Sequence, residues 1–385
     1  MKFLHLADLH LGRYLGEFSL VEDQKYMLEQ IVRLAKERGA DAVLMAGDIY
    51  DKAVPSEAAI ALFDSFLNEL RIAGIPAFVI SGNHDSDERL RFGSGFFEKG
   101  GIYIAAGFNG KLYKKTMRDE YGEIDIYLLP FVKASQVRHF FPDSHIDSYD
   151  SAVRTVIENA EIDFERRSII LAHQFVAGKG TDPQLGGSEG NAAQSIGLVE
   201  KIGWDIFENF DYAALGHIHS PQAVGSGSIR YSGSPLKYSL SEVLNKKTIP
   251  FVTINEKGKT ETELVEIAPL RDVRHIKGKM KNLLASENIK EPGDFIYVTL
   301  TDEDFVNDAA GIFRTVYPYL VKLDYENSHS EEIAKIDAAD EAAEKTFGQL
   351  VQEFYRQMYG TEMPEEERVV ITKAAVEAGI SDETD

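Results

Sequence analysis

The chain has 385 residues, with 41 Lys and Arg against 63 Asp and Glu, which gives a formal net charge of −22. Hydrophobic residues make up 44% of the sequence, so packed cores are expected and global disorder is excluded. There is no cysteine, which excludes disulfides and thiolate metal ligands. No stretch approaches the roughly 18 apolar residues of a membrane span, and the N-terminus is not typical of a signal peptide. We therefore expect an intracellular protein of two or three domains with no membrane partner.

The first half of the chain alternates short β-rich runs with segments of helical periodicity. Helices are expected at residues 22–38 and 56–72, and the segment 176–197, rich in Gly, Ser, Asp and Asn, predicts a long surface loop. The expected strands lie at residues 2–7, 42–46, 76–81, 102–106, 124–129, 168–172, 212–215, 229–232 and 250–254. Strands that alternate with helices in this way predict parallel βαβ units.

The character of the sequence changes near Pro269. A basic stretch at 271–281 is followed by an expected strand, a helix and a second strand, at residues 295–300, 304–315 and 319–323. From residue 331 onward the sequence is charged and helix-prone, with apolar residues at helical spacing and Pro364 between two helices. The domains expected from these changes are residues 1–268, 269–328 and 329–385.

Residues able to bind a metal follow the ends of several expected strands. They form the motifs D-x-H at 8–10, G-D at 47–48, G-N-H-D at 82–85, a single histidine at 173 and G-H-x-H at 216–219. Ligand sites of α/β sheets lie outside the carboxyl ends of their strands, so these motifs are expected to meet. Residues i and i+2 of an extended chain point the same way, which lets Asp8 and His10 face one site together.

The donor groups of these motifs are carboxylates, an amide and imidazoles, which suit manganese, iron, zinc or magnesium rather than a structural zinc finger. The candidate ligands are Asp8, His10, Asp48, Asn83, His173, His217 and His219. Seven ligands are too many for one tetrahedral ion but fit two ions that share a carboxylate, roughly 3.5–4 Å apart, and Asp48 is the natural bridge. The five histidines outside these motifs, His5 among them, lack such context and are expected to be structural or surface residues.

The ordered set of motifs resembles that of the calcineurin-like metallophosphoesterases and, more narrowly, that of the SbcD exonuclease subunits. The segments that carry the resemblance are LHLADLHLGR (4–13), AGDIYDKAVPS (46–56), ISGNHD (80–85), AHQFVAGKGTDPQLGGSE (172–189), ALGHIHSPQ (214–222) and YSGSPLKYSLSE (231–242). The resemblance implies an α/β (α+β) fold class: a β-sandwich flanked by helices in 1–268, a small α+β capping domain that contacts DNA in 269–328, and C-terminal helices with an acidic tail in 329–385.

The resemblance also implies a two-metal DNA nuclease, with 3′–5′ double-strand exonuclease and single-strand or hairpin endonuclease activity in DNA replication, repair and recombination. One ion would be held by Asp8, His10, Asp48 and His219, and the other by Asp48, Asn83, His173 and His217. His84 would act as general acid or transition-state stabiliser, and Asp85 would set its tautomer. The expected cofactors are two Mn²⁺ ions, with Mg²⁺ or Fe²⁺ as alternatives.

The implied partner is the coiled-coil ATPase SbcC, which would dock on the C-terminal helices and provide much of the grip on DNA. A homodimer within a heterotetramer, located in the cytoplasm at the nucleoid, is expected. Residues 178–181 lack the spacing of a P-loop, so no ATP site is expected in this chain. The basic run 271–281, together with Lys237, is expected to contact the DNA backbone; for the run 271–281 a solvated charged face is the alternative.

Relatives commonly carry a histidine where this chain has Asp51. Asp51 is expected either to hydrogen-bond a ligand histidine or to cap the helix that starts near Ser56. Two other functions stay open: a dimetal phosphatase or cyclic-nucleotide phosphodiesterase of the same fold, which would use similar ligands, and a non-catalytic scaffold. A scaffold should have gaps among its ligands, and none is missing.

Overall fold

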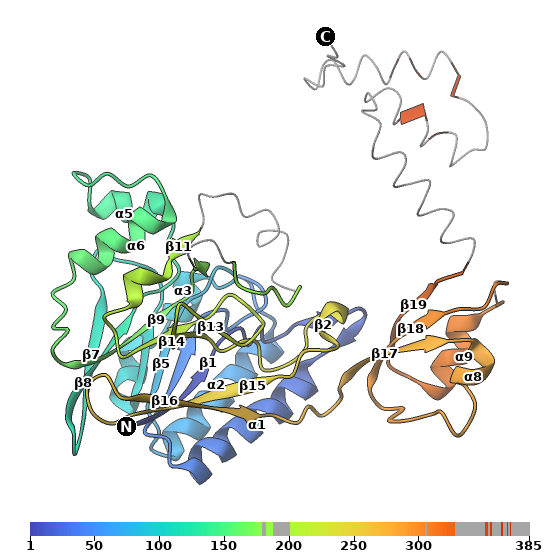
Figure 1. Cartoon of the computed structure of the whole chain (residues 1–385), viewed down its shortest axis with the longest axis horizontal. Helices are drawn as coiled ribbons and strands as arrows, with labels where there is room; N and C mark the ends of the chain where they lie inside the picture. The colour runs from blue at the N-terminus through green and yellow to red at the C-terminus, as the bar shows by residue number, and fades with distance from the viewer. Residues whose placement is uncertain are drawn as a thin grey trace. The chain divides into compact units, whose positions relative to one another are not determined.

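The computed structural model of the chain describes residues 1–178, 182–187, 201–304 and 306–327, with a few isolated positions between 351 and 370 (Figure 1). The chain divides into two compact units, of which the first comprises residues 1–277, 281–298 and 308–323 and the second comprises 278–280, 299–307 and the residues from 324 on. The domain boundaries expected at 268/269 and 328/329 stay predictions. The helices expected in 331–378 lie almost wholly outside the described residues.

The first of two large sheets contains the strands predicted in the N-terminal half. Its order is β16-β15-β1-β4-β5-β6, with β1 (Lys2–Leu6), β4 (Ala42–Ala46), β5 (Ala77–Ile80), β6 (Ile102–Ala105), β15 (Thr248–Ile254) and β16 (Thr260–Glu266). Strands β1, β4, β5 and β6 pair in parallel, which confirms the predicted βαβ units, and β15 and β16 add antiparallel. Helices α1 (Val21–Arg38) and α2 (Glu57–Ile72) connect these strands, and Ser56 caps α2 by accepting from the N–H of Ala59.

The second large sheet is mixed. Its order is β13-β14-β12-β9-β8-β7, with β7 (Tyr113–Asp119), β8 (Gly122–Leu128), β9 (Arg167–Ala172), β12 (Tyr212–Leu215), β13 (Gln222–Val224) and β14 (Ser226–Tyr231). Helices α5 (Ala134–Phe140) and α6 (Tyr149–Glu158) share a hydrophobic core with one face of this sheet. The short elements are β2 (Tyr14–Leu15), β3 (Phe18–Ser19), α3 (Asp87–Arg91), α4 (Ser94–Phe97), β10 (Val176–Ala177), β11 (Ile202–Gly203) and the 3₁₀ turns at Glu98–Gly100, Trp204–Phe207 and Leu240–Glu242.

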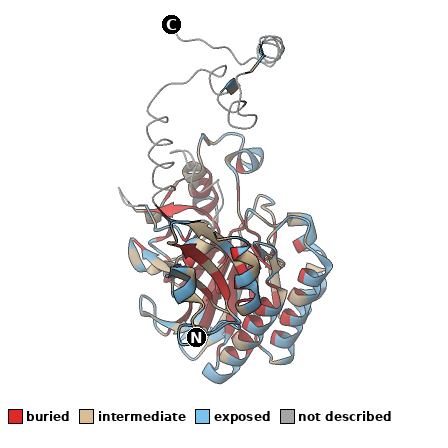
Figure 2. Ribbon diagram, turned by 90° about the vertical axis from the view of Figure 1, so that its right-hand side faces the viewer, coloured by how far each residue is buried: buried red, intermediate tan, exposed pale blue. Residues whose placement is uncertain are grey.

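The two large sheets pack face to face. Side chains of a strand alternate between its two faces. Phe3 of β1 and Ala7, which directly follows β1, join the core between the sheets, whereas Leu4 and Leu6 of β1 join the core under α1 and α2. Figure 2 shows these strands as buried and the outer faces of the helices as exposed. The predicted β-sandwich flanked by helices is therefore confirmed. No helix in the described part of the chain has the length and hydropathy that a membrane crossing requires.

A third sheet, of three strands, follows the sandwich. Its order is β17-β18-β19, formed by β17 (Val273–Gly278), β18 (Phe295–Leu300) and β19 (Leu320–Tyr325), with helices α8 (Met280–Leu283) and α9 (Ala309–Val316). Part of the basic run 271–281 is thus a strand. Arg271 pairs with Asp23 at 2.6 Å, and Arg274 pairs with Asp294 at 2.7 Å, so these two cations are held within the protein. This favours a structural role for both.

Candidate metal centre

The motifs that follow five strands converge at one place. Asp8 and His10 follow β1, Asp48 follows β4, and Asn83, His84 and Asp85 follow β5 of the first sheet; His173 follows β9, and His217 and His219 follow β12 of the second sheet. Sets of donor atoms lie within 4.8 Å of one another in the described chain: Asp8 with His10 and His219, Asp8 with Asp48 and His173, and His10 with Asp48 and His84. Both sheets therefore contribute to a single cluster.

Asp48 lies in the middle of this cluster. Its Oδ2 atom is 3.3 Å from Nε2 of His173 and 3.6 Å from Nε2 of His10. Its Oδ1 atom accepts the backbone N–H of His84 at 2.9 Å, which holds the carboxylate in place. Oδ2 of Asp48 is thus shared between imidazoles from two sides, as a bridging carboxylate requires.

On one side of Asp48, two imidazoles face each other. Nε2 of His10 and Nε2 of His219 are 3.1 Å apart, and both side chains are buried. Asp8 has its Oδ1 atom 4.0 Å from Nε2 of His219, and this carboxylate accepts the backbone N–H of His217 at 2.9 Å. Asp8, His10, Asp48 and His219 therefore surround one small space.

On the other side of Asp48 the cluster is more open. Oδ1 of Asn83 is 3.2 Å from Nε2 of His173 and 3.0 Å from Nδ1 of His217. Asn83 is exposed, and His217 and His84 are half-buried, whereas the other candidate ligands are buried. The cluster is thus reached from solvent past Asn83, His84 and His217.

The orientation of the imidazoles fits divalent cations. Nδ1 of His10 is 3.7 Å from a carboxylate oxygen of Asp51, and Nδ1 of His219 is 3.7 Å from one of Glu242. When both Nδ1 atoms carry the proton, the Nε2 lone pairs of His10 and His219 point at each other, which is unfavourable unless a cation lies between them. His173 donates from Nδ1 to the carbonyl of Ala46 at 2.7 Å, which likewise leaves Nε2 for an ion.

The electrostatics of the cluster agree with this fit. Burial lowers the pKa of His10 well below its ordinary value, and burial together with the charge of His173 lowers the pKa of His217 to about 3. Both imidazoles are therefore neutral at neutral pH, as metal ligands must be. Burial opposes a charge on His173, but the carboxylates of Asp48 and Asp8 outweigh it and raise the pKa of His173 to about 9. Positive charge beside Asp48 is thus favoured.

The backbone at the cluster is unusual. Four candidate ligands have a positive φ: Asp8 (53°), His10 (42°), Asp48 (49°) and His217 (94°), among six such non-glycine residues in the described chain. Residues other than glycine rarely adopt this conformation, and where they do, surrounding contacts must hold it. Gly82 shows how close the packing is, because a Cβ atom there would lie 2.2 Å from Oδ1 of Asp48.

The structure differs from expectation at Asp85. Nδ1 of His84 donates to the carbonyl of Asp51 at 2.9 Å, so this carbonyl, and not Asp85, sets the tautomer. The carboxylate of Asp85 instead accepts the backbone N–H groups of Ile49, Tyr50 and Gly82 at 3.1, 2.9 and 2.9 Å. Burial and the charge of Asp48 raise the pKa of Asp85 to about 6. Asp85 thus joins the loops after β4 and β5, a role that residue spacing does not reveal.

Several residues around the cluster have no motif that points to them. The ring of Tyr238 lies 5.6 Å from that of His10, and its hydroxyl donates to the carbonyl of Leu9. Lys247 is 2.5 Å from the buried carboxylate of Glu242. Burial alone would raise the pKa of Glu242, but the contact with His219 and the charge of Lys247 lower it to about 2. Tyr238 and Glu242 belong to the segment 231–242 noted above, which was the only signal in the sequence.

Comparison with known proteins finds matches to two family models and similarity to a nuclease subunit. The model of the calcineurin-like phosphoesterases matches residues 1–221, and that of the type 5 capsule protein repressor C-terminal domain (SbcD_C) matches residues 269–359. The D subunit of the nuclease SbcCD from Staphylococcus epidermidis is 31% identical over 363 residues, which cover 93% of either chain. This similarity extends beyond the metal cluster to nearly the whole chain.

Two solved structures are also similar over most of their length. A dimetal phosphatase from Danio rerio is 11% identical, with 70% of this chain and 98% of that chain covered and a TM-score of 0.38. The protein TT1561 of Thermus thermophilus is 14% identical, with 69% and 99% covered and a TM-score of 0.39. Scores this low do not bear on the function.

Proposed function

The chain belongs to the SbcD family of calcineurin-like phosphoesterases, and on this premise we propose the substrate, metals, residue roles and partners that follow. It is a metal-dependent phosphodiester hydrolase of the nuclease type. The substrate is DNA, which it cleaves as a 3′–5′ exonuclease on duplex ends and as an endonuclease on single strands and hairpins during repair and recombination. The observation that carries this proposal is the carboxylate of Asp48, shared between His10 and His173.

The cofactors in this proposal are two Mn²⁺ ions, which supply Lewis acidity toward the phosphate and a hydrolytic nucleophile. Asp8, His10, Asp48 and His219 hold one ion, and Asp48, Asn83, His173 and His217 hold the other. The grouping is supported by the two spaces on either side of Asp48. The donors are oxygen and nitrogen atoms only, which suits manganese and leaves Mg²⁺ and Fe²⁺ as alternatives.

His84 is the proton donor in this proposal. Its Nδ1–H bond to the carbonyl of Asp51 orients the ring and leaves Nε2 to donate to the leaving oxygen. Replacing it by glutamine, His84→Gln, is expected to lower turnover about 10²–10⁴-fold, the usual contribution of a general acid, while both Mn²⁺ ions still bind. Loss of Mn²⁺ from this variant would mean that His84 is a ligand instead.

The function is tested with purified protein, Mn²⁺ and end-labelled duplex DNA. We expect the labelled strand to shorten from its 3′ end, and Asp48→Asn to abolish cleavage. Asp64→Asn, on the exposed face of α2, is the matched control and should cleave like the wild type. Hydrolysis of p-nitrophenyl phosphate without any cleavage of DNA would instead favour a phosphatase of the same fold.

The proposed partner is an SbcC-type ATPase, because the Staphylococcus relative is one chain of the SbcCD nuclease. DNA lies in the cytoplasm, which is where we place the complex. ATP dependence would come from the partner, and the docking segment would be 329–385, which lies almost wholly outside the described residues. The test is co-purification of the two full-length chains, followed by an ATP-dependent assay on hairpin-ended DNA. Equal cleavage with and without SbcC and ATP would contradict this part of the proposal.

We also propose a homodimer. Phe92 and Phe96 follow the G-N-H-D motif at 82–85 by about ten residues. Their side chains are 84% and 81% exposed, which is unusual for residues of this size. A second copy of the chain that covered them would remove this apolar surface from water. Light scattering should therefore give the mass of a dimer for the wild type and of a monomer for Phe92→Ser/Phe96→Ser. A monomeric wild type would contradict the proposal.

A further inference from the structure

A buried ion pair between Glu242 and Lys247 lies directly behind the metal centre. The proposed function gives neither residue a role. Glu242, in the 3₁₀ turn Leu240–Glu242, has no exposed surface, and Lys247, which follows it by five residues, is also buried. Their charged atoms are 2.5 Å apart. Charged side chains are rarely buried unless they are paired, because removing charges from water is costly.

The carboxylate of Glu242 has a second neighbour besides the lysine. Its Oε1 atom is 3.7 Å from Nδ1 of His219, while Oε2 faces Lys247. The other ring nitrogen of His219, Nε2, points into the metal centre beside Nε2 of His10. A metal-bound histidine commonly directs its free N–H to a carboxylate, which fixes both tautomer and ring orientation. Glu242 lies on the side of His219 that this arrangement requires, at a distance longer than a direct hydrogen bond.

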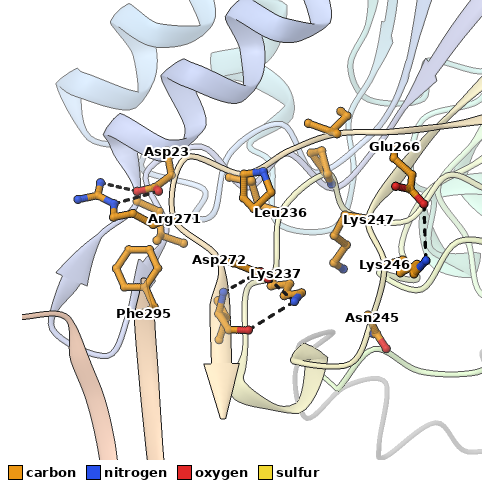
Figure 3. Close-up of a pocket in the computed structure, with 15 residues that line it drawn as sticks. Asp23, Leu236, Lys237, Asn245, Lys246, Lys247, Glu266, Arg271, Asp272 and Phe295 are labelled. Atoms are coloured by element: carbon orange, nitrogen blue, oxygen red, sulfur yellow. Dashed lines mark hydrogen bonds and ion pairs between the residues drawn. The ribbon is translucent and has the colours of Figure 1, made fainter. Parts of the chain in front are cut away.

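Lys247 contacts both His219 and Glu242. Besides its pairing with Glu242, it donates to the backbone carbonyl of His219 at 3.0 Å and to the hydroxyl of Ser234 at 2.8 Å. It therefore contacts the ligand residue and the carboxylate behind that ligand at the same time. Lys247 lines a cavity of about 200 Å³ together with Leu236, Lys246 and Glu266, of which the last two form an exposed pair. Figure 3 shows these side chains.

The imidazole on the facing side of the same ion space has a similar support. Nδ1 of His10 is 3.7 Å from Oδ1 of Asp51, and Arg13 pairs with that oxygen at 3.0 Å. Each of the two facing imidazoles is thus backed by a carboxylate that a cation holds. By contrast, His173 donates from Nδ1 to a neutral carbonyl, that of Ala46. The two ion spaces therefore have different surroundings.

We propose that Glu242, held by Lys247, is a positioning residue for the metal centre: its carboxylate keeps the Nδ1 proton of His219 on its own side and directs Nε2 toward the ion. The proposal rests on the function proposed above and assigns a role to a residue outside the ligand set. Losing such a partner typically weakens metal binding 10–100-fold.

The test compares Mn²⁺ binding by wild type and Glu242→Gln, with free Mn²⁺ measured by electron paramagnetic resonance during titration. We expect two bound ions in both proteins, with one of the two dissociation constants raised at least about 10-fold in the variant. The matched control is Glu266→Gln. The carboxylate of Glu266 pairs with Lys246 at 3.7 Å, and both side chains of this pair are mostly exposed. It should bind Mn²⁺ like the wild type.

Glu242→Gln also leaves the Lys247 charge buried without its partner, and that change alone could unfold the protein. The double variant Glu242→Gln/Lys247→Met removes both charges, and such replacements are often tolerated. If Glu242 positions His219, the double variant regains thermal stability but keeps the weakened Mn²⁺ site. Wild-type Mn²⁺ affinity in the double variant would overturn the proposal, because the pair would then serve stability alone.

The same titration separates this proposal from the one on which it rests. A wild type that binds no Mn²⁺ would contradict the metal centre itself. A wild type that binds two ions, together with a Glu242→Gln variant of unchanged affinity, would overturn only the role of Glu242.

Discussion

Backbone conformation at the metal centre depends on contacts between loops. Asp8 and His10 have positive φ values, and their N–H groups donate to the carbonyls of Gly47 at 3.1 Å and Asp48 at 3.0 Å. Backbone hydrogen bonds thus join the loop after β1 to the loop after β4. Each loop holds the other in a conformation that would be unfavourable alone, so ligand geometry is set before an ion binds.

Gly82 gives the first prediction at the scale of a residue. In Gly82→Ala the new Cβ atom would lie 2.2 Å from Oδ1 and 2.4 Å from the backbone nitrogen of Asp48, so the carboxylate of Asp48 must move. Displacements of about 1 Å at a catalytic group can cost about 10²-fold in rate, and we expect a loss of that size in DNA cleavage. Gly293→Ala, where a Cβ atom would have no neighbour within 4 Å, is the control. Full activity of Gly82→Ala would contradict the tight packing around Asp48.

His5 gives a prediction of pH dependence. It is buried and its Nδ1 lies 2.9 Å from the hydroxyl of Tyr212; burial, and then the charge of Arg230, lower its pKa from 6.5 to about 3. The unfolded chain therefore takes up this proton below pH 6.5 while the folded chain does not. The contribution of His5 to the free energy of unfolding is therefore complete above pH 6.5. It is lost as the pH falls toward 3, by up to about 1.4 kcal/mol per pH unit.

The variant His5→Asn removes this titration. Urea unfolding of metal-free protein at several values between pH 5 and pH 7 should show a shallower loss of stability for the variant than for the wild type. His10 and His217 titrate in both proteins, so the difference between the two curves isolates His5. Parallel curves would show that His5 takes up its proton equally in both states.

At the scale of secondary structure, the sequence predicts interior strands better than edge strands. Strands β4, β12 and β18 have the bounds expected from their apolar runs. The edge strand β6 was predicted, but β7 and β16, which each lie at the edge of a large sheet, were missed. Their sequences, YKKTMRD and TETELVE, carry charges on the exposed side, as edge strands that avoid aggregation commonly do. The apolar signal of a strand is therefore weakest where pairing is one-sided.

The basic run 271–281 was open to two interpretations because charge alone does not show what a side chain contacts. Its first arginine, Arg271, lies over the ring of Tyr319 at 4.6 Å and over that of Phe295 at 5.3 Å, and it pairs with the buried carboxylate of Asp23. These contacts tie Phe295, the first residue of β18, and Tyr319, the residue before β19, to α1 within the first unit. Arg271 therefore stabilises this packing, and its charge is paired within the protein and not directed toward DNA.

The prediction for this packing concerns Arg271→Ala. The change leaves Asp23 buried without its cation and empties the space between two rings, so we expect a loss of roughly 2–3 kcal/mol in the free energy of unfolding. The salt dependence of DNA binding should not change, because no phosphate contact is lost. Arg314→Ala, which breaks an exposed pair with Glu17, is the control and should cost below about 1 kcal/mol. A shallower salt dependence for Arg271→Ala would restore the interpretation as a DNA contact.

At the scale of the whole molecule, the metal centre lies where the two large sheets meet. The strand ends predicted the ligand types and their convergence, because parallel strands bring their carboxyl ends to one edge. Glu242 and Lys247 were not predicted, since they belong to no spacing motif and reach His219 only through the folded chain. Residues that support a ligand are chosen by tertiary contact, and a single sequence records such contacts poorly.

Because the ligands come from both sheets, bound ions should link them and stabilise the fold. Each Mn²⁺ present at 100 times its dissociation constant adds about 2.7 kcal/mol, so Tm should rise by several degrees with Mn²⁺ and fall back with a chelator. The net charge of −22 also offers many surface carboxylates to a cation, and weak binding there would raise Tm slightly in any variant. Asp48→Asn separates the two effects: its Tm should respond little to Mn²⁺. A rise equal to that of the wild type would place the stabilising ions on the acidic surface and not between the sheets.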